Sequence, residues 1–244
     1  MYENEIRVHT ADGEMTTFVA RPDEEGPYPV AVMYMDAPGY REAVKENARR
    51  FAADGYYCVA PDLFYRSGEN VTFDFSRMGE EGYRERMMSV IGSVKPDLVL
   101  ADTEAIFDAV GDDPSASKGP KVCVGYCMGA RLALHAAATK PDEFVAAAGI
   151  HPGALVTDQP DSPHHGVPNV RGELYFAFAE NDRTATAENV ELFRQELERH
   201  GVRGSVERLP GTHHGFAMAD SSVYDREATE HHFERTLDLW RRNI

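Results

Sequence analysis

The sequence predicts an α/β fold: a doubly wound, mostly parallel sheet with an N-terminal antiparallel hairpin and helices on both faces. From residue 30 onward, short apolar runs alternate with longer segments of helical spacing, the order that produces parallel strands joined by helical crossovers. The runs lack polar alternation, as expected of strands buried on both faces. Residues 5–9 do alternate, and the Asp12-Gly13 turn signal that follows indicates a hairpin with residues 15–20 as the partner strand.

The parallel part of the sheet is expected to contain six strands. They are predicted at residues 30–35, 56–60, 121–125, 144–150, 173–179 and 205–209. Helical spacing of apolar residues predicts helices at 41–53, 97–110, 128–139, 185–200 and 225–242. Gly55 and Gly201 stand where helix stops belong. Ligands of such sheets bind beyond the carboxyl ends of the strands, so the loops after these ends should share one rim.

The length of 244 residues fits a single domain spanning 1–244. Residues 64–95 are the hardest segment to interpret, because glycines interrupt the pattern while aromatic residues and arginines recur. We interpret them as a long excursion with short helices and as a candidate lid. Residues 151–170 are rich in Pro, Gly and His and are expected to form a loop.

Composition excludes several classes of function. The chain has 25 Lys and Arg against 41 Asp and Glu, a formal net charge of -16, which disfavours binding to nucleic acid. No apolar stretch approaches the roughly 20 residues of a membrane span, and no secretory signal is recognisable at the start. We therefore expect a cytoplasmic protein, a monomer or small homo-oligomer, whose partner is a small-molecule substrate.

The segment Gly125-Tyr126-Cys127-Met128-Gly129 lies between a predicted buried strand and a long predicted helix. This is the context in which G-x-[Ser/Cys]-x-G forms a nucleophile elbow, the strained turn typical of α/β-hydrolases. The two glycines let strand and helix approach closely. Cys127 then stands at a helix N-terminus, which favours a thiolate, and the N–H of Met128 is the expected oxyanion donor.

The other two cysteines lie inside predicted strands, so Cys58 and Cys123 are interpreted as packing residues. Three cysteines so widely spread do not make a disulfide framework, and a reducing compartment fits them best.

An elbow nucleophile needs a histidine base, and the base needs a carboxylate to orient it. In this fold the chain order is nucleophile, acid, histidine. His214 is favoured over its neighbour His213, because the glycine that follows it permits close approach to a substrate. Asp182 is the favoured acid, with Glu180 in reserve; helix capping alone is the alternative role for Asp182.

His151 follows the strand at 144–150 and should lie on the same rim. We assign it to the substrate pocket, with stabilisation of its own loop as the alternative.

Several segments resemble the dienelactone hydrolase family of α/β-hydrolases. They are Gly-Tyr-Cys-Met-Gly at 125–129, Ala-Glu-Asn-Asp at 179–182, His-Gly-Phe at 214–216 and the stretch 53–64. The resemblance spans nearly the whole chain and implies a triad of Cys127, His214 and Asp182. It also implies that the residue after the strand at 30–35 contacts the cysteine, and that the next N–H, of Ala37, is the second oxyanion donor.

The sequence departs from the family pattern in two places. The first is Asp36, which stands where similar enzymes have a glutamate that is one methylene longer. The second is Met218, at the position of an arginine that binds the substrate carboxylate in similar enzymes; a thioether cannot replace a guanidinium. Arg77, Arg84 or Arg86 of the excursion are candidates to substitute for it. Tyr126, beside the cysteine, is counted with Asp36, His151 and Met218 as an accessory residue.

The resemblance implies a hydrolase that cleaves a lactone or carboxylic ester, similar to a carboxymethylenebutenolidase, with no metal and no organic cofactor. Two alternatives stay open, a thioesterase acting on another acyl substrate and a non-catalytic ligand-binding relative. A thiol-redox or metal protein built on Cys123, Cys127 and His213 is disfavoured, because the sequence contains no C-x-x-C motif.

Overall fold

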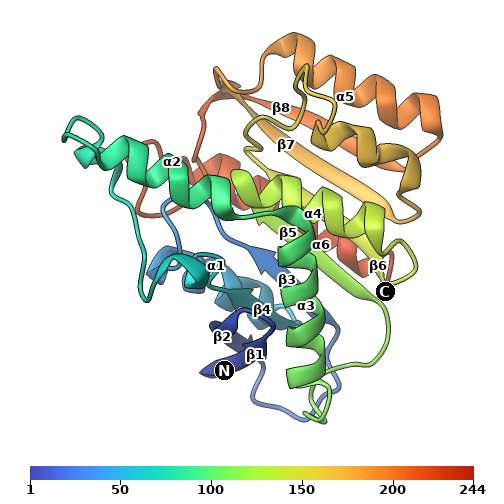
Figure 1. The fold of residues 1–244 in the computed structure, drawn as a ribbon. Helices are drawn as coiled ribbons and strands as arrows, with labels where there is room; N and C mark the ends of the chain where they lie inside the picture. Colours follow the sequence, from blue (N-terminus) through green and yellow to red (C-terminus); the bar gives the residue numbers. More distant parts are fainter.

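The computed structural model describes residues 1–244, and an eight-stranded sheet runs through its centre (Figure 1). In spatial order the strands are β1 (Tyr2–Thr10), β2 (Gly13–Arg21), β4 (Tyr57–Pro61), β3 (Val30–Tyr34), β5 (Lys121–Tyr126), β6 (Phe144–Ile150), β7 (Glu173–Asn181) and β8 (Gly204–His213). The β1–β2 and β2–β4 pairs are antiparallel and all other pairs are parallel. The predicted fold class is confirmed.

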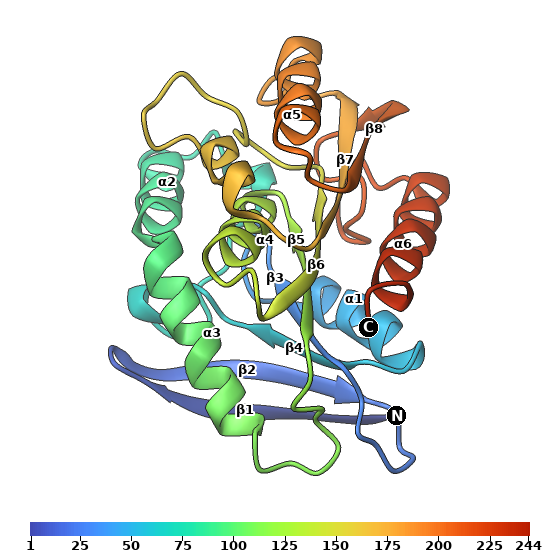
Figure 2. The ribbon, with the colours of Figure 1, turned by 90° about the vertical axis from the view of Figure 1, so that its right-hand side faces the viewer.

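Helices cover both faces of the sheet (Figure 2). One face carries α3 (Pro96–Val110), α4 (Met128–Thr139) and α5 (Ala187–His200), and the other carries α1 (Glu42–Ala53) and α6 (Arg226–Arg241). Strands β3 to β6 are buried almost throughout, which is why their sequences read as continuous apolar runs.

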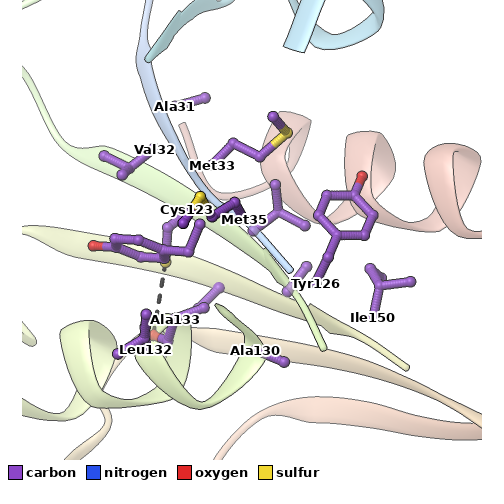
Figure 3. Packing of buried hydrophobic residues seen from close by; sticks show 14 of the residues in the cluster. Ala31, Val32, Met33, Met35, Cys123, Tyr126, Ala130, Leu132, Ala133 and Ile150 are labelled. Carbon is purple, nitrogen blue, oxygen red and sulfur yellow. Dashed lines mark hydrogen bonds between the residues drawn. The ribbon is translucent and has the colours of Figure 1, made fainter. Parts of the chain in front are cut away.

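Side chains of β5 alternate between the two helical layers (Figure 3). Cys123 faces α4, and its Sγ lies 3.7 Å from the carbonyl oxygen of Ala133. Tyr126 points the other way, and its ring centre lies 5.7 Å from that of His232 on α6. Cys58 and Cys123 are fully buried and not in disulfides, which confirms that they are packing residues.

Several element ends shift by a few residues from the predicted ranges, and two segments expected to be loops are regular structure. Strand β8 continues to His213, beyond the expected end at residue 209, because Pro210 and Gly211 are accommodated at an irregularity in the pairing with β7. The expected loop at 151–170 contains a 3-10 helix, η3 (Pro163–Asn169).

The excursion at 64–95 contains η1 (Tyr65–Ser67), η2 (Phe75–Arg77) and α2 (Tyr83–Ser93). Helix α2 fully buries only Met87, while Tyr83, Val90 and Ile91 are partly buried against the core. That this excursion acts as a lid stays a prediction. None of the helices combines the length and apolar character needed to cross a bilayer.

Candidate active site

Cys127 occupies a sharp turn between β5 and α4, with φ 54° and ψ −114°. A non-glycine residue rarely adopts a positive φ, and such strain concentrates at functional sites. The flanking glycines make the turn possible. A Cβ on Gly125 would lie 2.0 Å from the carbonyl oxygen of Gly129, and a Cβ on Gly129 would lie 2.3 Å from the carbonyl oxygen of Tyr34. Close main-chain contacts therefore leave room only for glycine on both sides of the turn, and Cys127 directly precedes the first residue of α4.

Asp182, from the loop after β7, and His214, directly after β8, meet beside this turn. His214 Nε2 lies 3.0 Å from Cys127 Sγ, and His214 Nδ1 lies 2.5 Å from Asp182 Oδ2. The second carboxylate oxygen of Asp182 accepts hydrogen bonds from the N–H and the hydroxyl of Thr184, at 2.8 and 2.7 Å. Both oxygens of the carboxylate are thus engaged, which fixes its plane and the ring that it contacts.

The pKa values of His214 and Asp182 are shifted in the directions expected of an ion pair. Burial lowers the pKa of His214, but hydrogen bonds to Asp182 and Cys127 outweigh burial and raise that pKa to about 10. Burial raises the pKa of Asp182, yet the hydrogen bonds from His214 and Thr184 bring it below its ordinary value. At neutral pH the imidazole is therefore protonated between a carboxylate and the sulfur.

Two backbone N–H groups near the cysteine are free of partners within the protein. Neither Met128 nor Ala37 donates its N–H to a backbone or side-chain acceptor. Met128 is the first residue of α4, so its N–H belongs to the unpaired set at a helix N-terminus. Ala37 lies in the loop after β3, the strand next to β5 in the sheet.

A model of the dienelactone hydrolase family matches residues 15–244 of the sequence. The chain belongs to the dienelactone hydrolase family.

Relatives agree with this assignment. A Yersinia pestis protein named "Putative carboxymethylenebutenolidase" is 25% identical over 239 residues, 96% of this chain and 86% of that protein. A Pseudomonas protein named carboxymethylenebutenolidase is 26% identical over 214 residues, covering 88% of this chain and 84% of its own. A Klebsiella pneumoniae structure described as a "Putative Dienelactone Hydrolase" superposes with a TM-score of 0.85 at 21% identity, covering 98% of both chains, and shows the same fold.

Asp36, at the position of the family glutamate, makes no hydrogen bond to Cys127. Both of its carboxylate oxygens instead accept from the guanidinium of Arg41, one of them at 3.1 Å. Burial raises the pKa of Asp36, and the hydrogen bonds from Arg41 oppose this without cancelling it. The expected contact with the sulfur is replaced by a buried ion pair.

Three predicted accessory residues are buried and present no surface to a substrate. Tyr126 is 1% exposed on the α6 side of the sheet, and Met218 is 1% exposed with its sulfur 3.6 Å from the amide nitrogen of Asn47. His151 is fully buried, with its ring centre 5.3 Å from that of His214. The assignment of His151 to the substrate pocket is therefore wrong in this structure, because its buried ring packs against the ring of His214.

The reserve candidates lie elsewhere. His213 is exposed at the end of β8, and Glu180 accepts a hydrogen bond from the N–H of Gly211. Helix α5 is capped by Thr186, so Asp182 does not cap it. No three His, Cys, Asp or Glu side chains converge as a metal site requires, and Cys123 faces the opposite layer from Tyr126 (Figure 3).

Sequence reasoning missed two residues of this region. The contact of Thr184 with Asp182 is predictable from the sequence, because Asp-x-Thr commonly forms a local hydrogen-bonded turn. The contacts of Arg41 are not predictable from the sequence, since one partner, Asp220, lies 179 positions away in the chain.

Proposed function

We propose that this member of the dienelactone hydrolase family hydrolyses carboxylic esters or lactones with Cys127 as the nucleophile, His214 as the acid–base group and Asp182 as its orienting carboxylate. The observation that carries the proposal is the continuous contact from sulfur to imidazole to carboxylate, at 3.0 and 2.5 Å. This is the arrangement by which a nucleophile, a base and an orienting group cooperate.

The thiolate of Cys127 attacks the carbonyl carbon, and a C–S bond forms as the carbonyl becomes an oxyanion. The free N–H groups of Met128 and Ala37 are the donors available to that oxyanion. When the tetrahedral intermediate collapses, the C–O bond breaks and the imidazolium of His214 gives its proton to the leaving alkoxide.

The neutral imidazole then removes a proton from water, which attacks the thioester. Breaking the C–S bond releases the carboxylic acid and restores the thiolate–imidazolium pair. In a lactone the acid and alcohol stay joined, so a single hydroxy acid leaves. The lactone class is supported by the names of the relatives, carboxymethylenebutenolidases.

Replacement of the nucleophile tests the proposal. Cys127→Ala should lower kcat/KM for p-nitrophenyl acetate by about 10⁴–10⁶-fold, the range seen when a nucleophile is removed. Cys123→Ala, which removes a sulfur that faces α4, is the matched control and should retain activity. Equal activity in the Cys127 variant and the wild type would refute the assignment, and a wild type inert towards esters and lactones would favour a non-catalytic relative.

A further inference from the structure

Arg41 joins two loops of the candidate active site. It stands at the end of the β3–α1 loop (residues 35–41) and donates to both carboxylate oxygens of Asp36 and to the carbonyl oxygen of Gly39, at 3.1 Å. The same guanidinium donates to both oxygens of Asp220, at 2.5 and 2.9 Å. Asp220 belongs to the β8–α6 loop (residues 214–225), which begins with His214.

The burial of the three charges is graded. The side chains of Asp36 and Arg41 are 5% and 16% exposed, whereas that of Asp220 is 47% exposed. The Arg41 guanidinium therefore binds two carboxylates. The buried one, Asp36, belongs to the loop that carries the Ala37 N–H. A planar guanidinium held on both sides has a fixed orientation, which a point-charge lysine would not provide.

The β8–α6 loop has separate anchors of its own. The Asn47 amide of α1 donates to the carbonyl oxygen of Ala217, at 3.3 Å, and the Thr229 hydroxyl of α6 lies 3.1 Å from the carbonyl oxygen of Phe216. His214 itself is held by Asp182. Arg41 therefore connects the β3–α1 loop to a loop that is already fixed.

We propose that Arg41 is a positioning residue that holds the Asp36–Ala37 segment, and with it the Ala37 N–H, against the β8–α6 loop in the geometry that the oxyanion needs. The inference rests on the proposed function. Arg41 acts through Asp36 and Asp220 and does not serve as the site for a substrate anion, because both of its carboxylate-binding edges are already filled.

Two reactions of Cys127 separate this role from a general disturbance. Ester acylation needs the oxyanion donors, whereas alkylation by iodoacetamide needs the thiolate and forms no oxyanion. Arg41→Met should lower kcat/KM for p-nitrophenyl acetate about 10–100-fold, somewhat less than complete loss of an oxyanion donor. The rate constant for iodoacetamide alkylation and its pH profile should stay at the wild-type values.

Asp220→Asn provides a gentler variant, because it releases the exposed end of the bridge and leaves the Asp36–Arg41 pair intact. It should change the same two rates in the same directions, with a smaller loss of kcat/KM. Arg49→Met is the matched control, since Arg49 lies on α1 and pairs with Glu3 and Glu42, neither of which belongs to the two loops. It should leave both rates unchanged.

A second ester, mono-4-nitrophenyl glutarate, carries a carboxylate and tests the rival role. Arg41→Met should lower kcat/KM for this ester and for the neutral acetate by the same factor. A rise in KM for the anionic ester alone, with the acetate unaffected, would overturn the proposal and make Arg41 a substrate-binding residue. A parallel loss of acylation and alkylation would also overturn it, since the whole site would then have changed.

The wild type separates failure of this inference from failure of the proposed function. If wild-type protein shows no Cys127-dependent hydrolysis, the proposed function fails and the inference fails with it. If wild-type protein hydrolyses the acetate and Arg41→Met does so equally well, only the inference fails.

Discussion

His214 and His151 lie with their ring centres 5.3 Å apart, yet their pKa values move in opposite directions. Burial lowers the pKa of both rings, and it is the largest single influence on each. In His214 the bonds to Asp182 and Cys127 reverse the effect and raise the pKa to about 10. In His151 nothing opposes burial sufficiently, and the positive charge of His214 lowers its pKa further, well below the ordinary value.

Other buried polar groups beside His214 also lack partners. Both ring nitrogens of His151, both of His232 and the hydroxyl of Tyr126 are buried without a hydrogen-bond partner within the protein. Burial lowers the pKa of His232 to about 3. A hydrogen-bonded carboxylate, and not burial, therefore decides which buried histidine carries a proton at neutral pH.

Removing that carboxylate should break the contrast, with the largest effect of the three tests. Asp182→Asn keeps the shape of the side chain but removes the charge, so the pKa of His214 should fall and the imidazolium should lose its orienting partner. We expect kcat to fall by about 10³–10⁴-fold, as when the acid of a comparable triad is replaced by its amide. Steady-state kinetics checks this, and a loss under tenfold would show that Asp182 is not the orienting acid.

The stability of the fold at acid pH tests the effect of a buried histidine that has no carboxylate partner. With a folded pKa of about 3, His232 stays neutral while the unfolded chain takes up a proton below about pH 6.5. Stability conferred by the neutral ring is therefore lost as the pH falls from about 6.5 towards 3, by up to about 1.4 kcal/mol per pH unit. His232→Phe should flatten the acid limb of the unfolding free energy by this amount, measured by urea denaturation between pH 6.5 and 4.5.

The control for that measurement is the adjacent residue. The side chain of His231 is 43% exposed and contacts Glu207, so His231→Gln serves as the surface control in the same measurement. Parallel pH curves for wild type and His232→Phe would contradict the assignment of the acid limb to His232.

The smallest effect is expected at His151. A phenylalanine puts another aromatic ring at this position without the two nitrogens that have no partner within the protein. Since an unmade hydrogen bond costs a buried group about 1–3 kcal/mol, His151→Phe should be neutral or stabilise the fold by about 1 kcal/mol. Thermal and urea unfolding measure this. Destabilisation beyond about 2 kcal/mol would indicate that internal water satisfies the ring nitrogens.

Sequence predicted the parts of this molecule in which local pattern and tertiary packing agree. Helix α4 and strand β6 begin and end where their apolar patterns do, and Cys127, Asp182 and His214 follow strand ends that one rim brings together. The end of β8 was missed because Pro210 and Gly211 have the composition of a loop, while pairing with β7 extends the strand past them.

The polar surroundings of the site could not be predicted in the same way. Residues after a strand can face the rim or turn beneath it, and a periodicity of two does not say which. The sequence therefore places His151 on the rim, whereas its side chain is fully buried. The partners of Asp36 and Arg41 depend on contacts between distant segments, for which a single sequence carries no signal.

The elbow also bears on how substitutions would distribute along the chain. A methyl group at position 125 or 129 would clash with main-chain atoms, which cannot move out of the way as a flexible side chain can. Position 127 is different, because its positive φ is relaxed only in glycine. Sequences chosen for folding alone would keep glycine at both flanks and drift towards glycine at the centre as well. Under the proposed function, the cysteine at the centre is explained by its reactivity, so the three positions show where the requirements of folding and of chemistry differ.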